Sequence, residues 1–114
     1  MKLKEAIKRA DEMRPNAISD ELKANWVQAV EGGIAELMGA ILPEQTFPRD
    51  KELLMPAPFD EVYCLYVCAM IDHVQQDSEM YYNDMTLYNA LMQDARAYYR
   101  RHNTPKASGN WRGL

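Results

Sequence analysis

The sequence contains little of what catalytic and metal sites are usually built from. Its 114 residues include only two cysteines and two histidines. It has no P-loop, no Gly-x-Gly-x-x-Gly fingerprint and no Gly-x-Ser-x-Gly turn. Di-iron bundles place a glutamate three residues before a histidine, but here Met70 precedes His73 and Tyr99 precedes His102 at that spacing. We therefore expect no metal, no other cofactor and no enzymatic activity.

The two cysteines, Cys64 and Cys68, lie four residues apart among apolar neighbours. This spacing places both on one helical face but does not orient them for a disulfide bond. Two thiolates are also only half of the four ligands of a closed zinc site. A nucleophilic cysteine needs a nearby base and a lowered pKa, whereas an apolar setting raises the pKa. We expect reduced, buried thiols, typical of a protein made in the cytoplasm.

Long hydrophobic runs are also absent. The longest run without a charged residue, 62–71, has ten residues, about half of the ~20 that a membrane-spanning helix needs. The chain starts Met-Lys-Leu-Lys and enters an amphipathic pattern at once, so we expect no signal peptide. Length and composition favour a soluble protein with one domain and no membrane partner.

Basic residues are scarce except at the C-terminal end. Residues 1–100 contain 10 Lys and Arg against 17 Asp and Glu, a balance of −7, whereas residues 101–114 contain three basic residues and no acid. An acidic body argues against sequence-specific DNA binding, which uses a basic face. The basic end is suited to an acidic partner surface or to phosphate.

Hydrophobic periodicity predicts four helices, over about residues 2–14, 19–41, 58–76 and 79–101. The helix over 58–76 contains the uncharged run, so it is expected to be buried on nearly every side. The stripe of the second helix is Leu22, Trp26, Val30, Ile34, Leu37 and Ile41, and that of the fourth is Tyr81, Met85, Tyr88, Met92, Ala95 and Tyr99. The predicted fold class is all-α: a small four-helix bundle with a long loop between the second and third helices and an extended C-terminal tail.

Local signals place the helix ends. Arg14 precedes a proline, which ends the first helix, and Ser19 caps the second. Pro58 is expected at the first position of the third helix. Asp77 and Ser78 are expected to cap the fourth.

Three features allow two interpretations each. The Gly32-Gly33 pair is either a tolerated weak point of its helix or a site where a neighbouring helix or subunit approaches closely, and Gly39 adds a further such position. The Asp77-Ser78 pair faintly resembles the phosphopantetheine site of acyl carrier proteins, but Gln76 and Glu79 depart from that motif and favour a plain cap. The seven tyrosines form either a half-buried aromatic contact between the last two helices or part of a subunit interface.

The irregular segment 42–57 and the C-terminal tail are the expected contact regions. Residues 52–55 are predicted to form a short strand that pairs with 45–47 or with another chain's edge. The candidate inter-subunit residues of this loop are Phe47, Arg49, Leu53, Leu54 and Met55. The chain is expected to divide into a helical domain, 1–102, and an extended arm, 103–114. The arm carries an aromatic anchor and basic residues, with Lys106, Trp111, Arg112 and Leu114 as candidate partner contacts. The alternative interpretation is a frayed terminus whose tryptophan has no partner.

Several short pieces, spread over nearly the whole chain, together resemble one family. The most specific is Leu53-Leu54-Met55-Pro56-Ala57-Pro58-Phe59-Asp60-Glu61-Val62-Tyr63, which follows Glu52. The others are Ala6 to Asp11 with Arg14-Pro15-Asn16, Trp26 ahead of Glu31-Gly32, Ala69-Met70-Ile71-Asp72, Met80-Tyr81-Tyr82-Asn83-Asp84, Leu87-Tyr88-Asn89, Ala97-Tyr98-Tyr99-Arg100-Arg101 and Thr104-Pro105. In order and content they resemble the head–tail connector (neck, or adaptor) proteins of long-tailed bacteriophages.

The resemblance implies a non-enzymatic structural protein of the virion neck, assembled in the cytoplasm of the bacterial host. Members of the family form helical rings, typically twelvefold, beneath the portal protein. They connect the portal to the tail, or to a tail-terminator or stopper protein, and help to retain packaged DNA. DNA would pass the channel without sequence-specific binding, as an acidic wall allows. The competing interpretation is a small acidic helical regulatory or inhibitory binding protein.

Overall fold

The computed structural model describes residues 1–42 and 47–103, and this part of the chain is all-helical and compact. The helices are α1 (Leu3–Met13), α2 (Asp20–Met38), α3 (Glu61–Val74) and α4 (Ser78–Asn103). An isolated antiparallel bridge between Lys2 and Glu52 is the only β-type pairing among the described residues. The predicted all-α class is confirmed.

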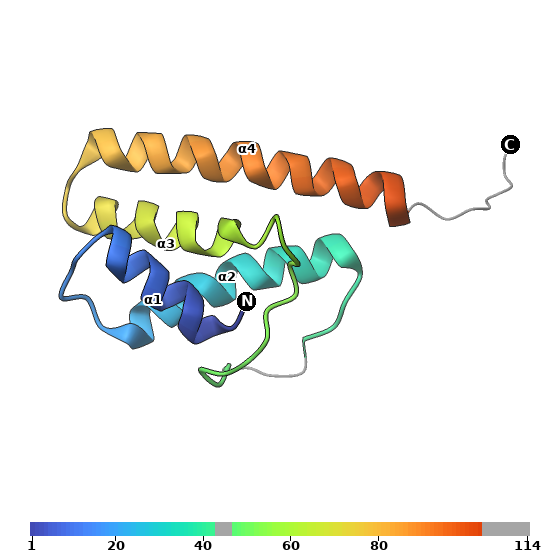
Figure 1. Ribbon diagram of the computed structural model, residues 1–114, viewed down its shortest axis with the longest axis horizontal. Helices are drawn as coiled ribbons and strands as arrows, with labels where there is room; N and C mark the ends of the chain where they lie inside the picture. Colours follow the sequence, from blue (N-terminus) through green and yellow to red (C-terminus); the bar gives the residue numbers. More distant parts are fainter. Residues whose placement is uncertain (43–46, 104–114) are drawn as a thin grey trace, which may run out of the picture.

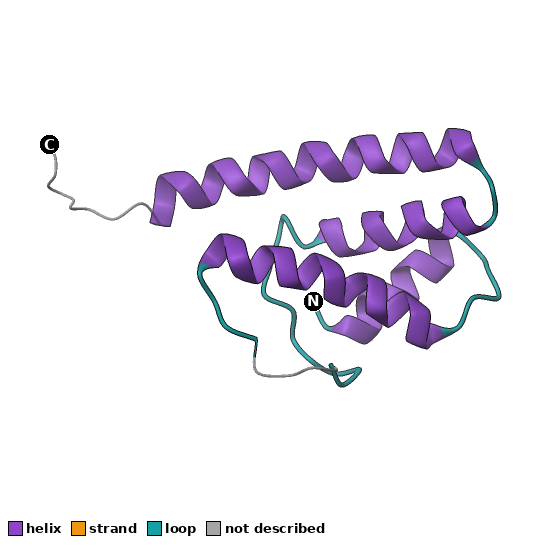
Figure 2. Ribbon diagram, turned by 180° about the vertical axis from the view of Figure 1, so that it is seen from behind, coloured by secondary structure: helices purple, strands orange, loops and turns teal. Residues whose placement is uncertain are grey.

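Helix α3 lies at the centre of the molecule. It contacts each of the other three helices, whereas α4 packs almost entirely against α3. Figures 1 and 2 show α4 on one side of α3, with α1 and α2 together on the other side. No residue from 62 to 71 is exposed, so the predicted burial of this uncharged run is confirmed.

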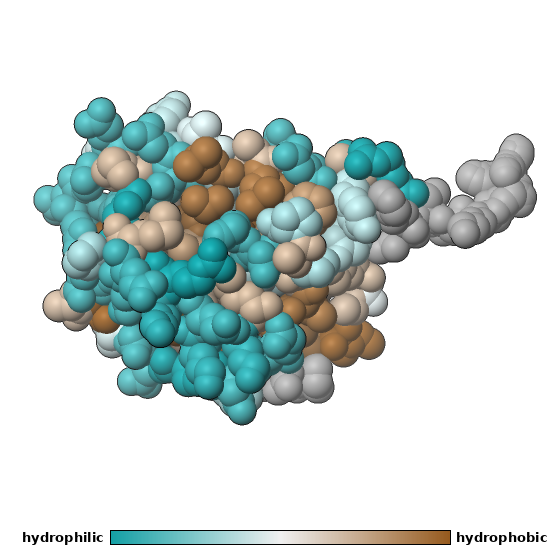
Figure 3. All heavy atoms as spheres, in the orientation of Figure 1, coloured by the Kyte–Doolittle hydropathy of each residue, from teal (hydrophilic) through white to brown (hydrophobic). Residues whose placement is uncertain are grey.

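The hydrophobic core is built from α1, α2 and α3, with a smaller contribution from α4 and from the loop before α3. Its fully buried large side chains include Leu3, Val27, Ile34, Met55, Val62, Tyr63, Val67 and Ile71. The predicted stripe of α4 is confirmed, because Met92 and Ala95 are buried and its other members are half-buried. Hydrophobic side chains also gather on the surface over α3 and α4, while hydrophilic ones cover α1 (Figure 3).

The buried face of α2 differs from the predicted stripe. Leu22 is 41% exposed and Ile41 is 90% exposed, although Val30 and Ile34 are buried as expected. The buried face instead includes Lys23, Ala24, Val27, Glu31 and Ala35. The predicted stripe therefore covers only part of this face, and a search for hydrophobic residues alone leaves out its two charged members, Lys23 and Glu31.

Two helix boundaries correct the sequence prediction. α2 ends at Met38 rather than near residue 41, because Gly39 takes the left-handed conformation (φ 69°) and donates its N–H to the carbonyls of Ala35 and Glu36. α3 begins at Glu61, so Pro58 is not its first residue. The N–H of Phe59 instead bonds the carbonyl of Pro56, which places Pro58 in a turn before the helix.

The helix caps are settled, and for the glycine pair the close approach of a neighbouring helix is excluded within the described residues, while the approach of a subunit stays a prediction. α1 ends at Met13, ahead of Pro15, and Ser19 accepts the N–H of Leu22, both as predicted. Asp77 alone caps α4 by accepting the N–H of Met80, since Ser78 is already the first helical residue. Gly32 and Gly33 are exposed, and nothing lies within 4 Å of a Cβ built at either, so no other part of the described chain approaches them closely.

The loop before α3 runs along the start of α1 and forms no strand in its described part. The carbonyl of Arg49 accepts the N–H of Lys4 (2.8 Å), and the carbonyl of Lys51 accepts that of Leu3 (3.0 Å). The N–H of Leu53 bonds the carbonyl of Met1. A helix start leaves its first N–H groups without intrahelical partners, and these carbonyls satisfy them. Glu52 and Leu53 therefore pair with the N-terminal segment, and the proposed pairing with 45–47 lies partly outside the described residues.

Candidate functional site

Most of the predicted loop contacts are used inside the chain itself. Phe47, Leu53 and Met55 are 6%, 5% and 0% exposed and belong to the hydrophobic core. Leu54 is half-buried against the same core. Arg49 is the member of this set with a well-exposed side chain, at 43%. Of these five predicted contacts, Arg49 is the one that remains available to a neighbour.

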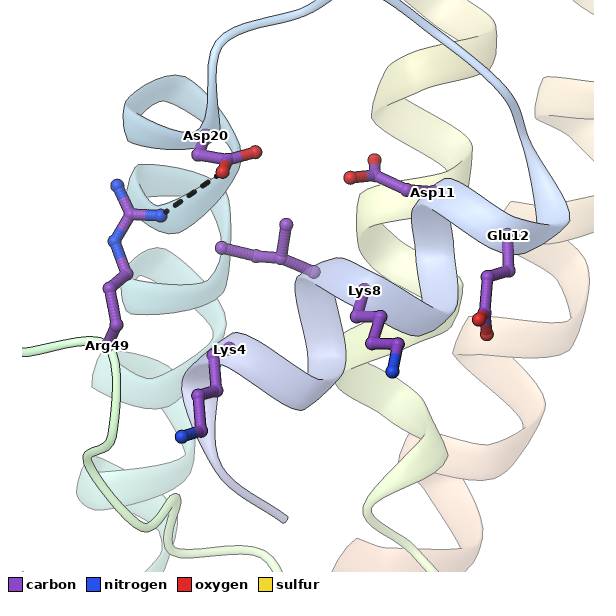
Figure 4. Close-up of a pocket in the computed structure, with 7 residues that line it drawn as sticks. Lys4, Lys8, Asp11, Glu12, Asp20 and Arg49 are labelled. Atoms are coloured by element: carbon purple, nitrogen blue, oxygen red, sulfur yellow. Dashed lines mark ion pairs between the residues drawn. The ribbon is translucent and has the colours of Figure 1, made fainter.

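Arg49 stands between two grooves. One, of about 430 Å³, is lined by Lys4, Ile7, Lys8, Asp11, Glu12, Asp20 and Arg49 (Figure 4). The other, of about 130 Å³, is lined by Glu21, Ala24, Asn25, Gln28, Phe47 and Arg49. The guanidinium of Arg49 lies 3.8 Å from the carboxylate of Asp20, an exposed pair that holds the loop beside the start of α2.

The larger groove is chemically a contact surface of mixed charge. Its walls carry three basic and three acidic side chains around Ile7, which is only 4% exposed. Figure 4 shows two basic side chains of α1, Lys4 and Lys8, followed along the helix by two acidic ones, with Asp20 and Arg49 on the far side of the groove. Its lining includes no serine, cysteine or histidine that could act as a nucleophile or base.

A buried ionic cluster joins three helices. Arg14, just after α1, donates from Nε to Asp72 Oδ1 of α3 (3.1 Å) and from Nη2 to both oxygens of Asp84 of α4 (3.0 and 3.1 Å). Asp72 and Asp84 are 1% and 3% exposed. The other oxygen of Asp72, Oδ2, is buried without a hydrogen-bond partner in the described part of the chain. One guanidinium therefore serves two carboxylates.

The pKa of Asp72 reflects this imbalance of charge. Burial raises it to about 7, and the neighbouring carboxylate of Asp84 adds to the increase, while Arg14 opposes it. A proton on Oδ2 removes one negative charge and turns the unpartnered oxygen into a donor. The cluster joins the end of α1 to α3 and α4, and its contribution to stability depends on pH.

A second buried network attaches the loop to α2 and α3. Glu31 of α2 is 0% exposed and accepts the Tyr63 hydroxyl at Oε1 and the Leu54 N–H at Oε2. The same hydroxyl accepts the N–H of Met55 (2.9 Å). Burial raises the pKa of Glu31, although these two donors partly offset the effect. Every polar atom of this network has a partner, so the loop is fixed at residues 54 and 55.

A third group of polar contacts holds the turn between α1 and α2. The ammonium of Lys23, a residue 2% exposed, lies 2.7 Å from Asp11 and 3.1 Å from the amide oxygen of Asn16. The amide nitrogen of Asn16 donates to Asp11 and to the carbonyl of Arg14. These bonds orient the start of α2 against the end of α1.

The cysteines are buried and free, as expected. The two thiols nevertheless differ. A hydrogen bond from Cys68 lowers the pKa of Cys64, which corrects the expectation for that thiol, whereas the same bond and burial raise the pKa of Cys68. Both are at most 1% exposed, which closes them to solvent.

The tyrosines form a half-buried aromatic contact between α3 and α4. Tyr66 packs against Tyr88, with ring centroids 5.2 Å apart. Tyr63 is fully buried and hydrogen-bonded, whereas Tyr82 is 74% exposed. The chain therefore contains both an internal aromatic contact and an exposed tyrosine that could serve an interface.

The buried charges Lys23, Glu31, Asp72 and Asp84 were missed by sequence reasoning, which treated charged residues as surface residues. Two signals were present. Lys23 and Glu31 are spaced four residues on either side of buried Val27, which places all three on one face of a helix. Asp72 directly follows the uncharged run 62–71. Their partners lie far away in sequence, and only the fold reveals them.

The arm residues Lys106, Trp111, Arg112 and Leu114 lie outside the described residues. α4 continues through Asn103, the first residue of the predicted arm.

Over the described ranges, no group of three or more His, Cys, Asp or Glu side chains could hold a metal ion. None of the helices there is long and apolar enough to cross a membrane. Comparisons with protein-family models, with curated proteins and with solved structures find no match to the chain.

Proposed function

We propose that the chain is a non-enzymatic structural protein of a long-tailed bacteriophage, forming a ring between the portal and the tail. The residues of the family-like pieces carry this proposal, because they meet in space. Arg14, Asp72 and Asp84 come from three separate pieces and form one buried ionic cluster. This contact between residues of different pieces supports the proposal.

The second network repeats this agreement. Glu31 comes from the Glu31-Gly32 piece, while Leu54, Met55 and Tyr63 come from the most specific piece, and buried hydrogen bonds join them. Two independent networks thus use residues that first suggested the family. This supports a shared arrangement of helices and loop, which is the scaffold of the proposed adaptor.

The charge distribution suits a ring through which DNA passes. With a balance of −7 over residues 1–100, the body repels phosphate and lets DNA slide without adhering. The grooves beside Arg49 present both signs of charge, which suits contact with another protein better than contact with a polyanion.

In this proposal the domain is a rigid four-helix bundle and the segment after α4 is its extended contact arm. The three polar networks fix the bundle and its loop, so binding does not require the body to refold. The basic arm, with Lys106, Trp111, Arg112 and Leu114, reaches the portal or an adjacent subunit. A tail protein, or a terminator or stopper, would occupy the opposite face of the ring.

Electron microscopy of the chain mixed with purified portal protein from the same genome tests the proposal. We expect added density on the tail-side face of the portal, arranged around its axis. Portal particles that look the same with and without the chain would contradict the proposal. A chain that instead binds and blocks an unrelated cellular protein, without touching the portal, would favour the regulatory alternative.

A further inference from the structure

One side of α4 is hollowed by a groove whose chemistry suits an aromatic side chain. This α4 groove, of about 350 Å³, is lined by Tyr81, Tyr82, Met85, Thr86 and Asn89. All five lining residues belong to α4, so the groove is half of a contact that another chain could complete. Tyrosine and methionine are enriched in interface cores, and the amide of Asn89 offers an acceptor and donors.

We propose that the α4 groove binds residues 104–114 of a second copy of this chain, with Trp111 in the groove and Arg112 beside Glu79. The proposal rests on the ring assembly proposed above and names the contact that would form it. Trp and Arg are the residue types that most often dominate binding energy at interfaces. An indole packs well on tyrosine rings and on a thioether, and its N–H needs an acceptor such as the Asn89 amide oxygen.

Charge complementarity supports the same occupant. Glu79 is exposed and lies three residues before Tyr82, so it shares the face of the groove. The segment 104–114 carries Lys106 and Arg112 and no acidic residue. A basic segment is therefore matched to an acidic body and, at the groove, to a specific carboxylate.

Chain length favours a second copy over the chain's own segment. From Asn89, the lining residue nearest the end of α4, to Asn103 is 14 residues, about 21 Å of helix. From Asn103 to Trp111 is eight residues, which span at most about 26–29 Å when fully extended. Reaching its own groove would therefore leave a length of only about two residues for the reversal of direction after α4. The same segment meets no such limit when it enters the groove of an adjacent copy.

Such a contact is heterologous, because one copy contributes its arm and the next contributes its groove. Repeated contacts of this kind close into a ring or continue as a filament. Each copy has one arm and one groove. A variant with a disabled arm or a disabled groove should therefore end the chain of head-to-tail contacts. This property gives the proposal a distinctive test.

The test combines two variants that fail for different reasons. Trp111→Ala disables the arm, and Tyr82→Ala disables the groove at a residue that is 74% exposed, so the fold should be unaffected. Analytical ultracentrifugation and native mass spectrometry should show each variant self-associating about tenfold or more weakly than wild type. Mixed together, the two variants should form a one-to-one dimer and nothing larger.

Leu87→Ala is the matched control, because Leu87 is 56% exposed on the same helix but does not line the groove. It should assemble like wild type. A mixture of the two variants that stays monomeric, or variants that each assemble like wild type, would overturn the groove contact. If wild type forms rings through another surface, the groove contact is wrong but the proposed function stands. If wild type neither self-associates nor binds the portal, the proposed function is wrong as well.

A charge exchange tests the second half of the contact. Glu79→Lys and Arg112→Glu should each weaken self-association, and the double variant should restore most of it, because the pair is re-formed with reversed signs. Single variants without effect, or a double variant weaker than both, would remove Glu79 and Arg112 from the contact.

Discussion

At the scale of single residues, buried charges decide how the helices are held together. Arg14 reaches Asp72 and Asp84, so the end of α1 is tied to both α3 and α4. Buried ion pairs cost free energy to desolvate, and removal of one partner leaves the other charge uncompensated. Here a single cation faces two carboxylates. The charges of the cluster therefore cancel only when one of the two carboxylates is protonated.

This balance predicts a pH dependence of stability. The pKa of Asp72 is raised to about 7 in the folded chain, above the ordinary value of about 3.9. The folded state therefore binds more protons than the unfolded state between these values, and the contribution of Asp72 to stability falls as pH rises through 7. Asp72→Asn resembles the protonated side chain and should not lose this contribution.

Urea unfolding of wild type and Asp72→Asn at several pH values checks the prediction. Between about pH 5 and pH 8, the free energy of unfolding of the variant should rise by on the order of 2 kcal/mol relative to that of wild type. Cys68 and Asp84 face the same cluster, so the comparison should stop below the range in which thiols titrate. A difference between the two proteins that stays constant over this range would contradict the account.

The Glu31–Tyr63 network predicts a second effect at this scale. Tyr63→Phe keeps the ring but leaves the Glu31 carboxylate and the Met55 N–H without their shared partner. The free energy of unfolding should fall by about 1–3 kcal/mol, the cost of unpaired buried polar groups. Tyr66→Phe, at a half-buried tyrosine that packs against Tyr88, should stay within about 0.5 kcal/mol of wild type. Equal losses in the two variants would show that the hydroxyl network does not matter.

At the scale of elements, the sequence predicts the existence of all four helices but not all of their ends or faces. Ser19 and Pro15 act locally, so the boundaries that they set follow from sequence alone. Pro58 was misplaced because a turn closed by the Pro56 carbonyl competes with the helix. The buried face of α2 was missed because Lys23 and Glu31 become core residues only when their partners arrive from α1, α3 and the loop.

The candidate site shows the same limit. The sequence indicated the loop as a contact region, but three of its five residues pack into the core. Their burial depends on carbonyls at positions 49 and 51 pairing with the start of α1, a contact nearly fifty residues away that no local pattern reveals. The α4 groove was partly visible as an excess of tyrosines.

Substitution of two glycines, Gly32 within α2 and Gly39 just after it, should have effects of opposite sign on stability. Gly39 has a left-handed backbone (φ 69°), so Gly39→Ala should destabilise the chain by about 1 kcal/mol. Gly32 is helical and exposed, with nothing within 4 Å of an added Cβ, so Gly32→Ala should stabilise it by about 0.5–1 kcal/mol. Thermal unfolding measures both. A Gly32→Ala variant that folds normally but fails to assemble would instead indicate that a subunit approaches this glycine.

At the scale of the whole molecule, folding and assembly should depend on separate parts of the chain. The core and the three polar networks lie within residues 1–103. Deletion of 104–114 should therefore change the unfolding temperature little, while it abolishes docking through the arm. Circular dichroism and native mass spectrometry measure the two effects. A truncated chain that loses its helical signal, or one that assembles normally, would contradict this division.

The charge of the molecule is unevenly distributed, with an acidic body and a basic arm. A head-to-tail contact uses both and leaves the mixed-charge grooves beside Arg49 for a different protein, such as the portal or a tail component. Raising the salt concentration should weaken contacts at these exposed charges more than it weakens the bundle, in which the charged residues Lys23, Asp72 and Asp84 are buried.

The central claim is that the chain is a ring-forming adaptor, and the mass of its assembly with the portal tests it most directly. Native mass spectrometry of wild type, alone and with purified portal from the same genome, should show a closed oligomer whose copy number matches the portal, with portal present in one defined complex. A chain that remains a monomer or dimer, and whose mass is unchanged by added portal, would contradict the account.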